Sequence, residues 1–466
     1  MASDQAGREA PPAPQQESPG AVQLKAVLLS PGYLKLLLLA ALVGIPVSLV
    51  AFGFVVLEHQ MQHWVWTSLP FELGFHQPPW WWPLPTLALA GVLIVPVLTR
   101  MPGKGGHLPV RGLGGPPVPP KALPSVVIAA LVALPLGASL GPEAPLMALG
   151  GGLALLGVAR AKREAQPKAA AIVGTAGSSA AIATIFGNPV IGCVMVLEAA
   201  GLGGPQLLLL VVPCLLASGV GALVFTGFGH WTGLDIGALT LQSVPRSEVP
   251  TAPDYLWGIP LAALIAVVVV AVQTLGWTTY DFTTRRTGAH IIACAVGVGV
   301  CTAAYALLTG RSPEEAALSG QETLSQLAAN PQSWGVATLV LLALFKGLAY
   351  GICLGSLRGG PIFPAVTIGA ALGIACAGLP GFGAAAGLSV GLAASGAAIT
   401  GLPVTASLLA ILLVGANARD AAPLMLVAAV VSFVVATKLR PKPSEQAPGP
   451  VQGPASAGAD PGTAQT

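Results

Sequence analysis

Two short stretches of this sequence, at 141–153 and 360–372, carry the same pattern of glycine and proline. The first reads GPEAPLMALGGGL and the second GPIFPAVTIGAAL, so both follow G-P-x-x-P with glycine at the tenth position and leucine at the thirteenth. Further along, FGNPVIG (186–192) and TGLPVTA (400–406) share G-x-P-V. Matches in the same order, at offsets of 219 residues (141 to 360) and 214 residues (187 to 401), indicate an internal duplication.

The composition of the chain is typical of an integral membrane protein. Of its 466 residues, 54% are hydrophobic and 8% are charged, whereas soluble domains carry roughly 25% charged residues. Apolar stretches such as LKLLLLAALVGIPVSLVAFGFVVL and IPLAALIAVVVVAVQTL recur along the chain, and about 20 mainly apolar residues suffice for one helix to span a bilayer. We therefore expect an all-α polytopic membrane protein embedded in a lipid bilayer.

The repeat and the hydropathy together divide the chain into five segments. We expect a disordered N-terminal tail at 1–21, a first membrane half-repeat at 22–226, an extracellular-side loop at 227–249, a second membrane half-repeat at 250–440 and a disordered C-terminal tail at 441–466. Both tails are rich in proline and in small or polar residues, and they bury too little apolar surface to fold. No soluble domain is expected.

The positions of the basic residues predict how the chain is oriented in the membrane. Lysine and arginine gather at 100–121, 160–168, 285–286 and 438–442, while the loops around 230–256 and 311–333 are acidic or mixed. Because basic loops tend to stay in the cytoplasm, we expect a multi-pass protein of the cell membrane with both termini cytoplasmic. No nucleic-acid partner is expected.

The cysteines and histidines give no sign of a metal site or a cofactor. The six cysteines lie singly in apolar runs, no CxxC or Cys/His spacing occurs, and the six histidines are scattered. Isolated cysteines of this kind behave as small core residues. We therefore expect neither a bound metal nor any cofactor.

The two Gly-Pro signals predict interrupted helices. Proline is tolerated in the first turn of a helix, where its missing N–H would have been unpaired in any case. A helix that begins at Pro142 or Pro361 exposes its next amides together with a partial positive charge, and in lipid these groups need a partner. An anion is one suitable partner; a capping hydroxyl or carbonyl is the other.

With these residues identified, the chain resembles the CLC family of chloride channels and chloride/proton exchangers over nearly all of 22–440. The family's G-(K/R)-E-G-P signature reads GPEAP at 141–145, its G-x-F-x-P signature reads GPIFP at 360–364, and its G-S-G-x-P signature reads GGHLP at 105–109. FGNPVIGCVMVLE (186–198) is similar to a further family helix. The resemblance implies a CLC-like inverted repeat of two halves with interrupted, tilted helices, in a homodimer with a separate anion pathway in each subunit.

The resemblance also implies which residues face chloride or another small monovalent anion. Glu143 would be the gate, a tethered carboxylate that competes with the anion for the helix-end amides. Gly106 and Ala144 would lie at the anion, with Ile362 and Phe363 supplying amides. The alternative for Glu143 is a structural carboxylate paired to a buried cation, for which Lys346 and Arg358 are the candidates.

The chain departs from the family pattern at the predicted anion site. Gly106 replaces a serine whose hydroxyl faces the anion, and no tyrosine follows Tyr350, although the family uses one from a later helix. Pro361 stands where the family donates a backbone N–H, which proline lacks. Lys104 and His107 lie close to the first of these changes and could draw anions inward, or they could simply face the cytoplasmic surface.

A fourth departure concerns proton coupling. Exchangers of the family carry an inner glutamate that passes protons, and the alignment on Pro189 puts Ala199 at that position, directly after Glu198. Glu198 is a possible proton relay, although one residue along a helix turns a side chain by about 100°. The alternative is a structural charge near a helix end.

These observations favour gated passive conduction of anions, with a proton-coupled chloride exchanger as the alternative and a secondary transporter outside the CLC family as a remote one. A membrane-embedded enzyme using Glu143 would need a second carboxylate, a Ser/His pair or metal ligands in matching apolar segments. None is visible in the sequence, and no P-loop occurs. We therefore expect no enzyme and no catalytic residues.

Overall fold

The computed structural model describes residues 19–113, 115, 117–160, 167–201, 205–233, 241, 244 and 249–440. The C-terminal tail, most of the N-terminal tail and most of the predicted loop at 227–249 lie outside these residues. Within them the structure is helical, and its only β-type pairing is an isolated bridge between Gly141 and Gly360.

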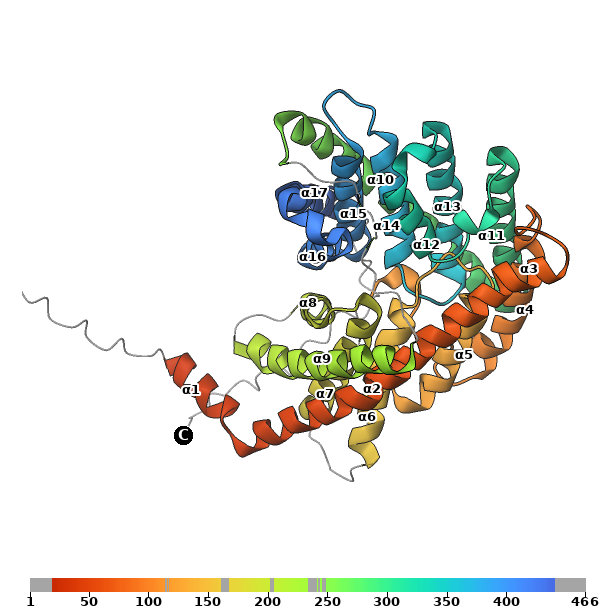
Figure 1. The fold of residues 1–466 in the computed structure, drawn as a ribbon. Helices are drawn as coiled ribbons and strands as arrows, with labels where there is room; N and C mark the ends of the chain where they lie inside the picture. Colours follow the sequence, from red (N-terminus) through yellow and green to blue (C-terminus); the bar gives the residue numbers. More distant parts are fainter. Residues whose placement is uncertain are drawn as a thin grey trace, which may run out of the picture.

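The helices fall into two sets that follow the predicted half-repeats (Figure 1). The first set consists of α1 (Pro19–Leu28), α2 (Pro31–His63), α3 (Leu69–Glu72), α4 (Pro83–Arg100), α5 (Leu123–Ala133), α6 (Glu143–Arg160), α7 (Pro167–Phe186), α8 (Pro189–Ala200) and α9 (Pro205–Thr232). The second consists of α10 (Ala252–Arg285), α11 (Thr287–Thr309), α12 (Gln321–Ala329), α13 (Val336–Ser356), α14 (Ile362–Ala375), α15 (Ala384–Thr400), α16 (Pro403–Val414) and α17 (Ala418–Leu439). A π-helical turn, Trp64–Ser68, joins α2 to α3.

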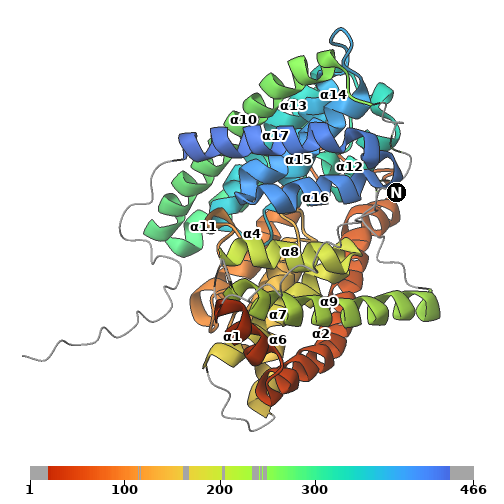
Figure 2. The same cartoon turned by 90° about the vertical axis from the view of Figure 1, so that its left-hand side faces the viewer.

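Equivalent helices of the two halves make equivalent contacts. In the first half α6 packs on α7, and α7 packs on α8 and α9; in the second half α14 packs on α15, and α15 packs on α16 and α17. The two halves meet through the antiparallel Gly141–Gly360 bridge, and α8 lies against α16 across the boundary, as Figure 2 shows. This is the inverted repeat of tilted, interrupted helices that the family resemblance implied.

Close helix contacts in both halves depend on glycine at repeated positions. A Cβ on Gly150 of α6 would collide with the carbonyl of Gly177 of α7, and a Cβ on Gly369 of α14 would collide with the carbonyl of Gly391 of α15. These two pairs are related by the offsets of 219 and 214 residues found in the sequence. Lipid supplies no hydrophobic drive for membrane helices to associate, so their association depends on close packing. Small residues allow that close packing.

Eight helical segments in the described part of the chain are long and apolar enough to cross a membrane. Four shorter apolar segments accompany them: Pro120–Ala133, Pro189–Ala200, Ile362–Ala375 and Ala384–Thr400. A helix such as α14 is only about 21 Å long, less than the roughly 30 Å of a bilayer core. Such helices therefore begin or end at membrane depth, where their free backbone groups can form a site.

Several predicted boundaries differ from those observed. The two helices that follow the Gly-Pro signals begin at Glu143 and Ile362, one residue after the prolines, because Pro142 and Pro361 occupy the cap position. α1 begins at Pro19, inside the segment predicted as tail, and α9 continues to Thr232, beyond the predicted limit at 226. The composition of tails and loops did not indicate these helical extensions.

Candidate functional site

The two Gly-Pro turns lie side by side at the boundary between the halves. The backbone N–H of Gly141 donates to the carbonyl of Gly360 at 2.7 Å, and the N–H of Gly360 donates back to the carbonyl of Gly141. This pair of hydrogen bonds holds the residues before α6 and α14 together, so both helices start from one junction. The N-termini of two helices from opposite halves therefore meet at one point inside the protein.

The side chain of Glu143 reaches from the start of α6 to the start of α14. It is fully buried, with a relative exposure of 0%, and its Oε1 accepts a 3.0 Å hydrogen bond from the backbone N–H of Phe363. The N–H groups of Ile362 and of Glu143 itself also face this carboxylate. Its second oxygen, Oε2, has no hydrogen-bond partner among the described residues. The carboxylate thus lies where two helix ends favour an anion, with one oxygen free.

Glycine is required on both sides of this carboxylate. A Cβ added to Gly360 would overlap Oε2 of Glu143, and a Cβ added to Gly141 would overlap the same carboxylate. The side chain of Glu143 therefore fills the space that two missing side chains leave. This explains why glycine precedes proline in both copies of the motif.

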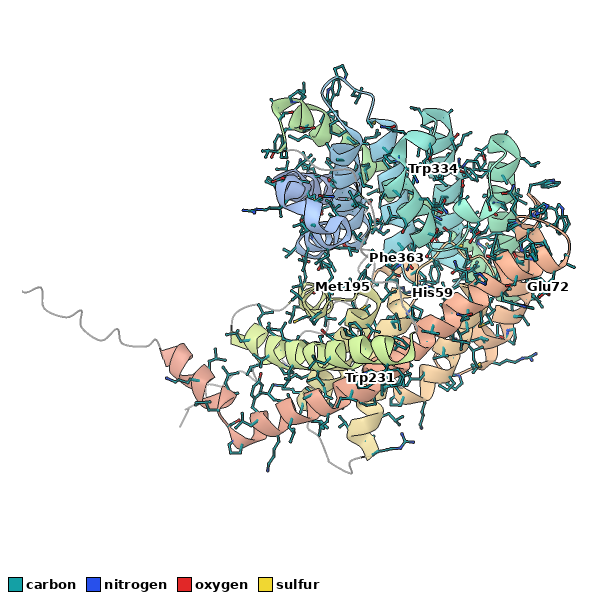
Figure 3. The ribbon with its side chains drawn as sticks, viewed as in Figure 1. His59, Glu72, Met195, Trp231, Trp334 and Phe363 are labelled. Atoms are coloured by element: carbon teal, nitrogen blue, oxygen red, sulfur yellow. The ribbon has the colours of Figure 1, made fainter. Side chains whose placement is uncertain are left out.

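Tyr350 and Phe186 complete the walls of the site, and the sequence analysis assigned neither of them a role there. Tyr350 of α13 is buried, and its hydroxyl donates to the carbonyl of Pro361 at 2.5 Å, which fixes the residue before α14. Phe186, the last residue of α7, packs against Phe363 with ring centroids 5.7 Å apart. Figure 3 labels Phe363 near the boundary between the halves. The repeat pattern could have indicated Phe186, because it precedes the second repeated motif.

Four of the five predicted anion-site residues lie at the junction. Glu143 and Ala144 begin α6, and Ile362 and Phe363 begin α14. Gly106 instead lies in the loop before the short 3-10 helix Pro109–Arg111, with a φ of +86°. A Cβ at Gly106 would lie 2.9 Å from Val126. The positive φ and this neighbour favour glycine over the family's serine.

His107 and Lys104 differ in their surroundings. Burial lowers the pKa of the His107 imidazole, so this side chain is neutral near pH 7 and offers an anion no charge. Lys104 is exposed and has a φ of +47°, and its carbonyl accepts a hydrogen bond from Arg358 Nε at 3.3 Å. Of the two, Lys104 alone can attract anions through its charge.

Lys346 and Arg358 are bonded to carbonyl groups rather than to Glu143. Lys346 is completely buried in α13, and its Nζ donates to the carbonyls of four consecutive residues, 315–318, at 2.8–3.4 Å. Arg358 donates to the carbonyls of Lys104 and Leu357. No ion pair joins either cation to Glu143 in the part of the chain that the structure describes. The alternative in which Glu143 is the structural partner of a buried cation is therefore not supported.

Glu198 caps a helix of the opposite half. Its Oε1 accepts from the N–H of Val404 at 3.0 Å, and its Oε2 accepts from the N–H and the hydroxyl of Thr405 at 2.7 and 2.6 Å. All three groups belong to the first turn of α16, so a carboxylate from α8 satisfies helix-end donors. These contacts favour the structural interpretation of Glu198 over the relay.

Glu58 is a second buried carboxylate, on a helix that packs against α6, and the sequence analysis did not identify it. Its relative exposure on α2 is 4%, and its charge interacts with that of Glu143. The run LEHQMQH at 57–63 resembles the polar end of a spanning helix, so the sequence alone does not indicate that this carboxylate belongs to a site. Only the packing of α2 on α6 brings it to the site.

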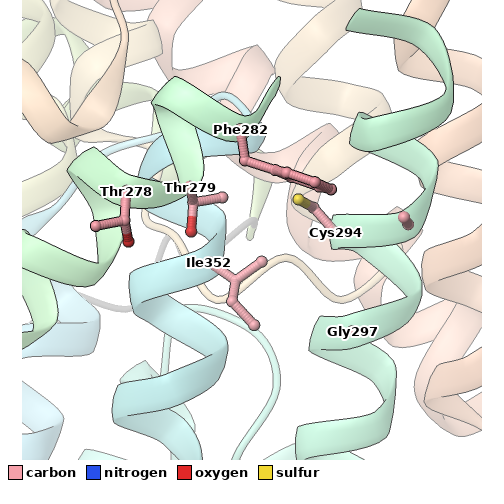
Figure 4. A pocket seen from close by; sticks show the side chains of 7 residues that line it. Thr278, Thr279, Phe282, Cys294, Gly297 and Ile352 are labelled. Atoms are coloured by element: carbon pink, nitrogen blue, oxygen red, sulfur yellow. The ribbon is translucent and has the colours of Figure 1, made fainter. Parts of the chain in front are cut away.

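One cavity of the protein lies away from the Glu143 site. A cavity of about 330 Å³ is lined by residues of α10, α11 and α13, among them Thr279, Phe282, Cys294 and Ile352 (Figure 4). None of the residues of the Glu143 site lines it. Among the described residues, no group of three or more histidine, cysteine, aspartate or glutamate side chains is placed to hold a metal ion.

Comparison with known proteins shows the family of this chain. The family model described as voltage gated chloride channel matches residues 109–437. Curated proteins named ion-transport protein YfeO, from Escherichia coli strain SMS-3-5 and from Escherichia fergusonii, are each 30% identical to the chain over 348 residues, which cover 72% of this chain and 77% of theirs.

The fold is also similar to solved structures. A slow cyanobacterial Cl⁻/H⁺ antiporter has a TM-score of 0.70 at 22% identity, covering 87% of this chain and 94% of its own. A CLC-type fluoride/proton antiporter has a TM-score of 0.69 at 17% identity, covering 87% and 95%. At these identities the likeness establishes the fold, while the family model and the relatives establish descent. The chain belongs to the voltage-gated chloride channel (CLC) family.

Proposed function

We propose that this protein moves chloride or a similar small monovalent anion through a pathway in each subunit, and that Glu143 is the gate of that pathway. The observation that carries the proposal is the position of the Glu143 carboxylate. It occupies the junction of two helix N-termini, accepts a hydrogen bond from Phe363 N–H, and keeps Oε2 unpartnered. Such a junction favours negative charge, and here the protein itself supplies that charge.

The gate works by competition between the tethered carboxylate and a free anion. While Glu143 is ionised and in place, its Oε1 occupies the Phe363 amide. When the side chain is protonated or swings away, the amides of Ile362, Phe363 and Ala144 become available to a chloride ion. Proline at 361 contributes no donor, so the ion is held by few groups. A low affinity for the ion is compatible with conduction, because conduction requires that the bound ion can also dissociate.

Passive conduction is the favoured mode because the cytoplasmic proton route lacks a suitable residue. Ala199 stands at the position of the inner relay, and an alanine carries no proton. The neighbouring Glu198 has both oxygens engaged in capping α16. A stoichiometric exchange of chloride for protons would need another route from the cytoplasm to Glu143.

The test is chloride efflux from proteoliposomes with simultaneous recording of external pH. We expect chloride to leave with no fixed ratio of protons entering. Glu143→Gln should keep transporting while its dependence on external pH flattens. A constant chloride-to-proton ratio in the wild-type protein would identify an exchanger, and potassium leaving as fast as chloride under matched gradients would refute an anion pathway.

Oligomeric state and orientation belong to the same proposal. By its resemblance to the family, the protein forms a homodimer whose two pathways work separately, with both termini in the cytoplasm of the cell. Counting subunits by single-molecule photobleaching in liposomes tests the dimer. Labelling of single cysteines introduced at residue 5 and at residue 460 in intact cells tests the orientation: a label that reaches either site from outside contradicts it.

A further inference from the structure

Glu58 is the one other acidic side chain that the structure buries deeply within the described membrane-spanning segments. It lies on α2 with a relative exposure of 4%, and Nε2 of His59 is 3.7 Å from its Oε2. An ionisable group at membrane depth is costly, and by default it marks a functional position. The competition between chloride and Glu143 described above makes no use of Glu58.

The contact between α2 and α6 puts Glu58 and Glu143 at similar distances from a shared point on the two helices. α2 and α6 are in contact, and a Cβ on Gly157, near the end of α6, would lie 3.7 Å from Val43, near the start of α2. From that contact Glu58 is about 22 Å further along α2, and Glu143 is about 21 Å back along α6, at 1.5 Å per residue. Both carboxylates are buried, with relative exposures of 4% for Glu58 and 0% for Glu143.

Apart from His59, which is a cation only when protonated, no basic side chain among the described residues is bonded to this pair; Lys25 of α1 and Arg160 of α6 lie in the last turns of their helices. Lys346 and Arg358 donate to backbone carbonyls. Of the other helices packed on α2, α7 carries one charged residue, Lys168 in its first turn, and α9 carries one histidine, His230, near its end. Two carboxylates that lie close together in a low-dielectric region cannot both be ionised without a large cost. The pair therefore holds a proton more readily than either member would alone.

A polar route leads from Glu58 to the surface. The side chain of His59 is 40% exposed, faces Gln321, and is labelled near the boundary between the halves in Figure 3. Gln321 lines a polar cavity of about 80 Å³ together with Gln62, Ser312, Glu314, Glu315 and Glu322. Burial and the neighbouring carboxylates raise the pKa of Glu314 to about 7, so this cavity exchanges protons near neutral pH.

We propose that Glu58 and Glu143 share one proton, and that Glu58 is the residue through which the pH on the His59 side of the membrane reaches the gate. This inference rests on the proposed role of Glu143. In the transfer the O–H bond of Glu58 breaks and its proton binds Oε2 of Glu143, the oxygen that has no partner. Glu58 is left as a carboxylate and takes its next proton from His59 or from water. Glu143, now neutral, yields the amides to chloride.

The experiment measures chloride efflux against external pH for the wild-type protein, Glu58→Gln, Glu58→Asp and Glu143→Gln. Without the second carboxylate, Glu143 holds its proton less well, so Glu58→Gln should need a more acidic medium, by roughly one pH unit, for half-maximal transport. Glu58→Asp keeps the carboxylate and should stay near the wild-type midpoint. Glu72→Gln, which removes an exposed carboxylate at the end of α3, is the matched control and should change nothing.

The outcomes separate this inference from the proposed function. If Glu143→Gln flattens the pH dependence while Glu58→Gln keeps the wild-type midpoint, Glu143 is the gate and Glu58 has no part in it. If Glu143→Gln leaves the pH dependence intact, the proposed function itself fails. If Glu58→Gln does not fold, Glu58→Asp supplies the test. Because it keeps the carboxylate, a pH midpoint of transport displaced by as much as one unit from the wild-type value would refute the shared proton. A purely structural role for Glu58 would lower protein yield without moving the midpoint.

Discussion

Replacing Glu198 tests whether this residue caps α16 or relays protons. Its carboxylate accepts three hydrogen bonds from the first turn of α16, two from backbone amides and one from the Thr405 hydroxyl. Glu198→Ala removes all three acceptors and the negative charge beside a helix N-terminus. Glu198→Gln keeps an acceptor of the same shape without the charge. The two variants therefore separate hydrogen bonding from charge.

The expected loss of stability follows from the number and the exposure of these hydrogen bonds. A hydrogen bond to a charged group contributes roughly 1.5–3 kcal/mol when its donor is buried. Val404 as a residue is 62% exposed, so water replaces part of the hydrogen bonding that is lost there. Removing a helix cap costs about 0.5–2 kcal/mol. We expect Glu198→Ala to lower the free energy of unfolding by about 2 kcal/mol and Glu198→Gln by about 1 kcal/mol.

Thermal unfolding in detergent, followed by tryptophan fluorescence, measures the stability, and proton flux under a chloride gradient measures the relay. Thr405→Val removes one of the three hydrogen bonds and leaves the carboxylate, so its effect on stability should be smaller than that of Glu198→Ala. A Glu198→Gln protein that keeps its thermal stability but loses a measurable, stoichiometric proton flux would refute the capping interpretation. It would also show that the proton route runs through α8.

Three further changes test the site and its supports. Gly360→Ala places a Cβ where Glu143 Oε2 lies, so it should displace the Glu143 side chain and raise chloride efflux at pH 8 in the proteoliposome assay. Gly157→Ala is the control, because a Cβ fits there, and it should leave efflux at pH 8 unchanged. Lys346→Met leaves four carbonyls of the 315–318 turn without their donor, and thermal unfolding should show a loss of about 1–3 kcal/mol. Burial raises the pKa of Glu314 from its ordinary value of 4.5 to about 7. The cost of ionising it in the folded protein therefore grows as the pH rises above 4.5 and is complete above about 7, so Glu314→Gln should raise the Tm at pH 8 and have little effect at pH 4.

The repeat could be predicted from sequence because its most demanding positions admit only one residue type. Glycine at 141 and 360 leaves room for the Glu143 carboxylate, and glycine at 150 and 369 lets neighbouring helices touch. Such positions carry the same residue in both halves, and they can therefore be recognised in the sequence at fixed offsets. The starts of α6 and α14 followed from the same signals to within one residue, because a proline can stand only at or before the first turn.

The partners of the charged side chains could not be predicted, because they depend on packing between segments distant in sequence. Glu198 lies 206 residues from Val404, and Glu58 reaches Glu143 only through the register of α2 on α6. Lys346 was a candidate partner for Glu143, yet it is bonded to the 315–318 turn. A sequence read without tertiary contacts shows that these charges are costly in a membrane, but it does not show which group offsets the cost.

The divergence between the two halves accounts for how, in the proposed mechanism, one junction can both attract and exclude an anion. Gly141 and Gly360 bond to each other symmetrically, and a fully symmetric repeat would present two helix N-termini with no internal acceptor. Glutamate at 143 and isoleucine at 362 break that symmetry, so one carboxylate serves the donors of two helices. A second glutamate at 362 would bring two like charges together and leave no unmet donors for chloride. In the mechanism that we propose, a single glutamate closes the junction when ionised, and its protonation returns the amides of both helix ends to the anion.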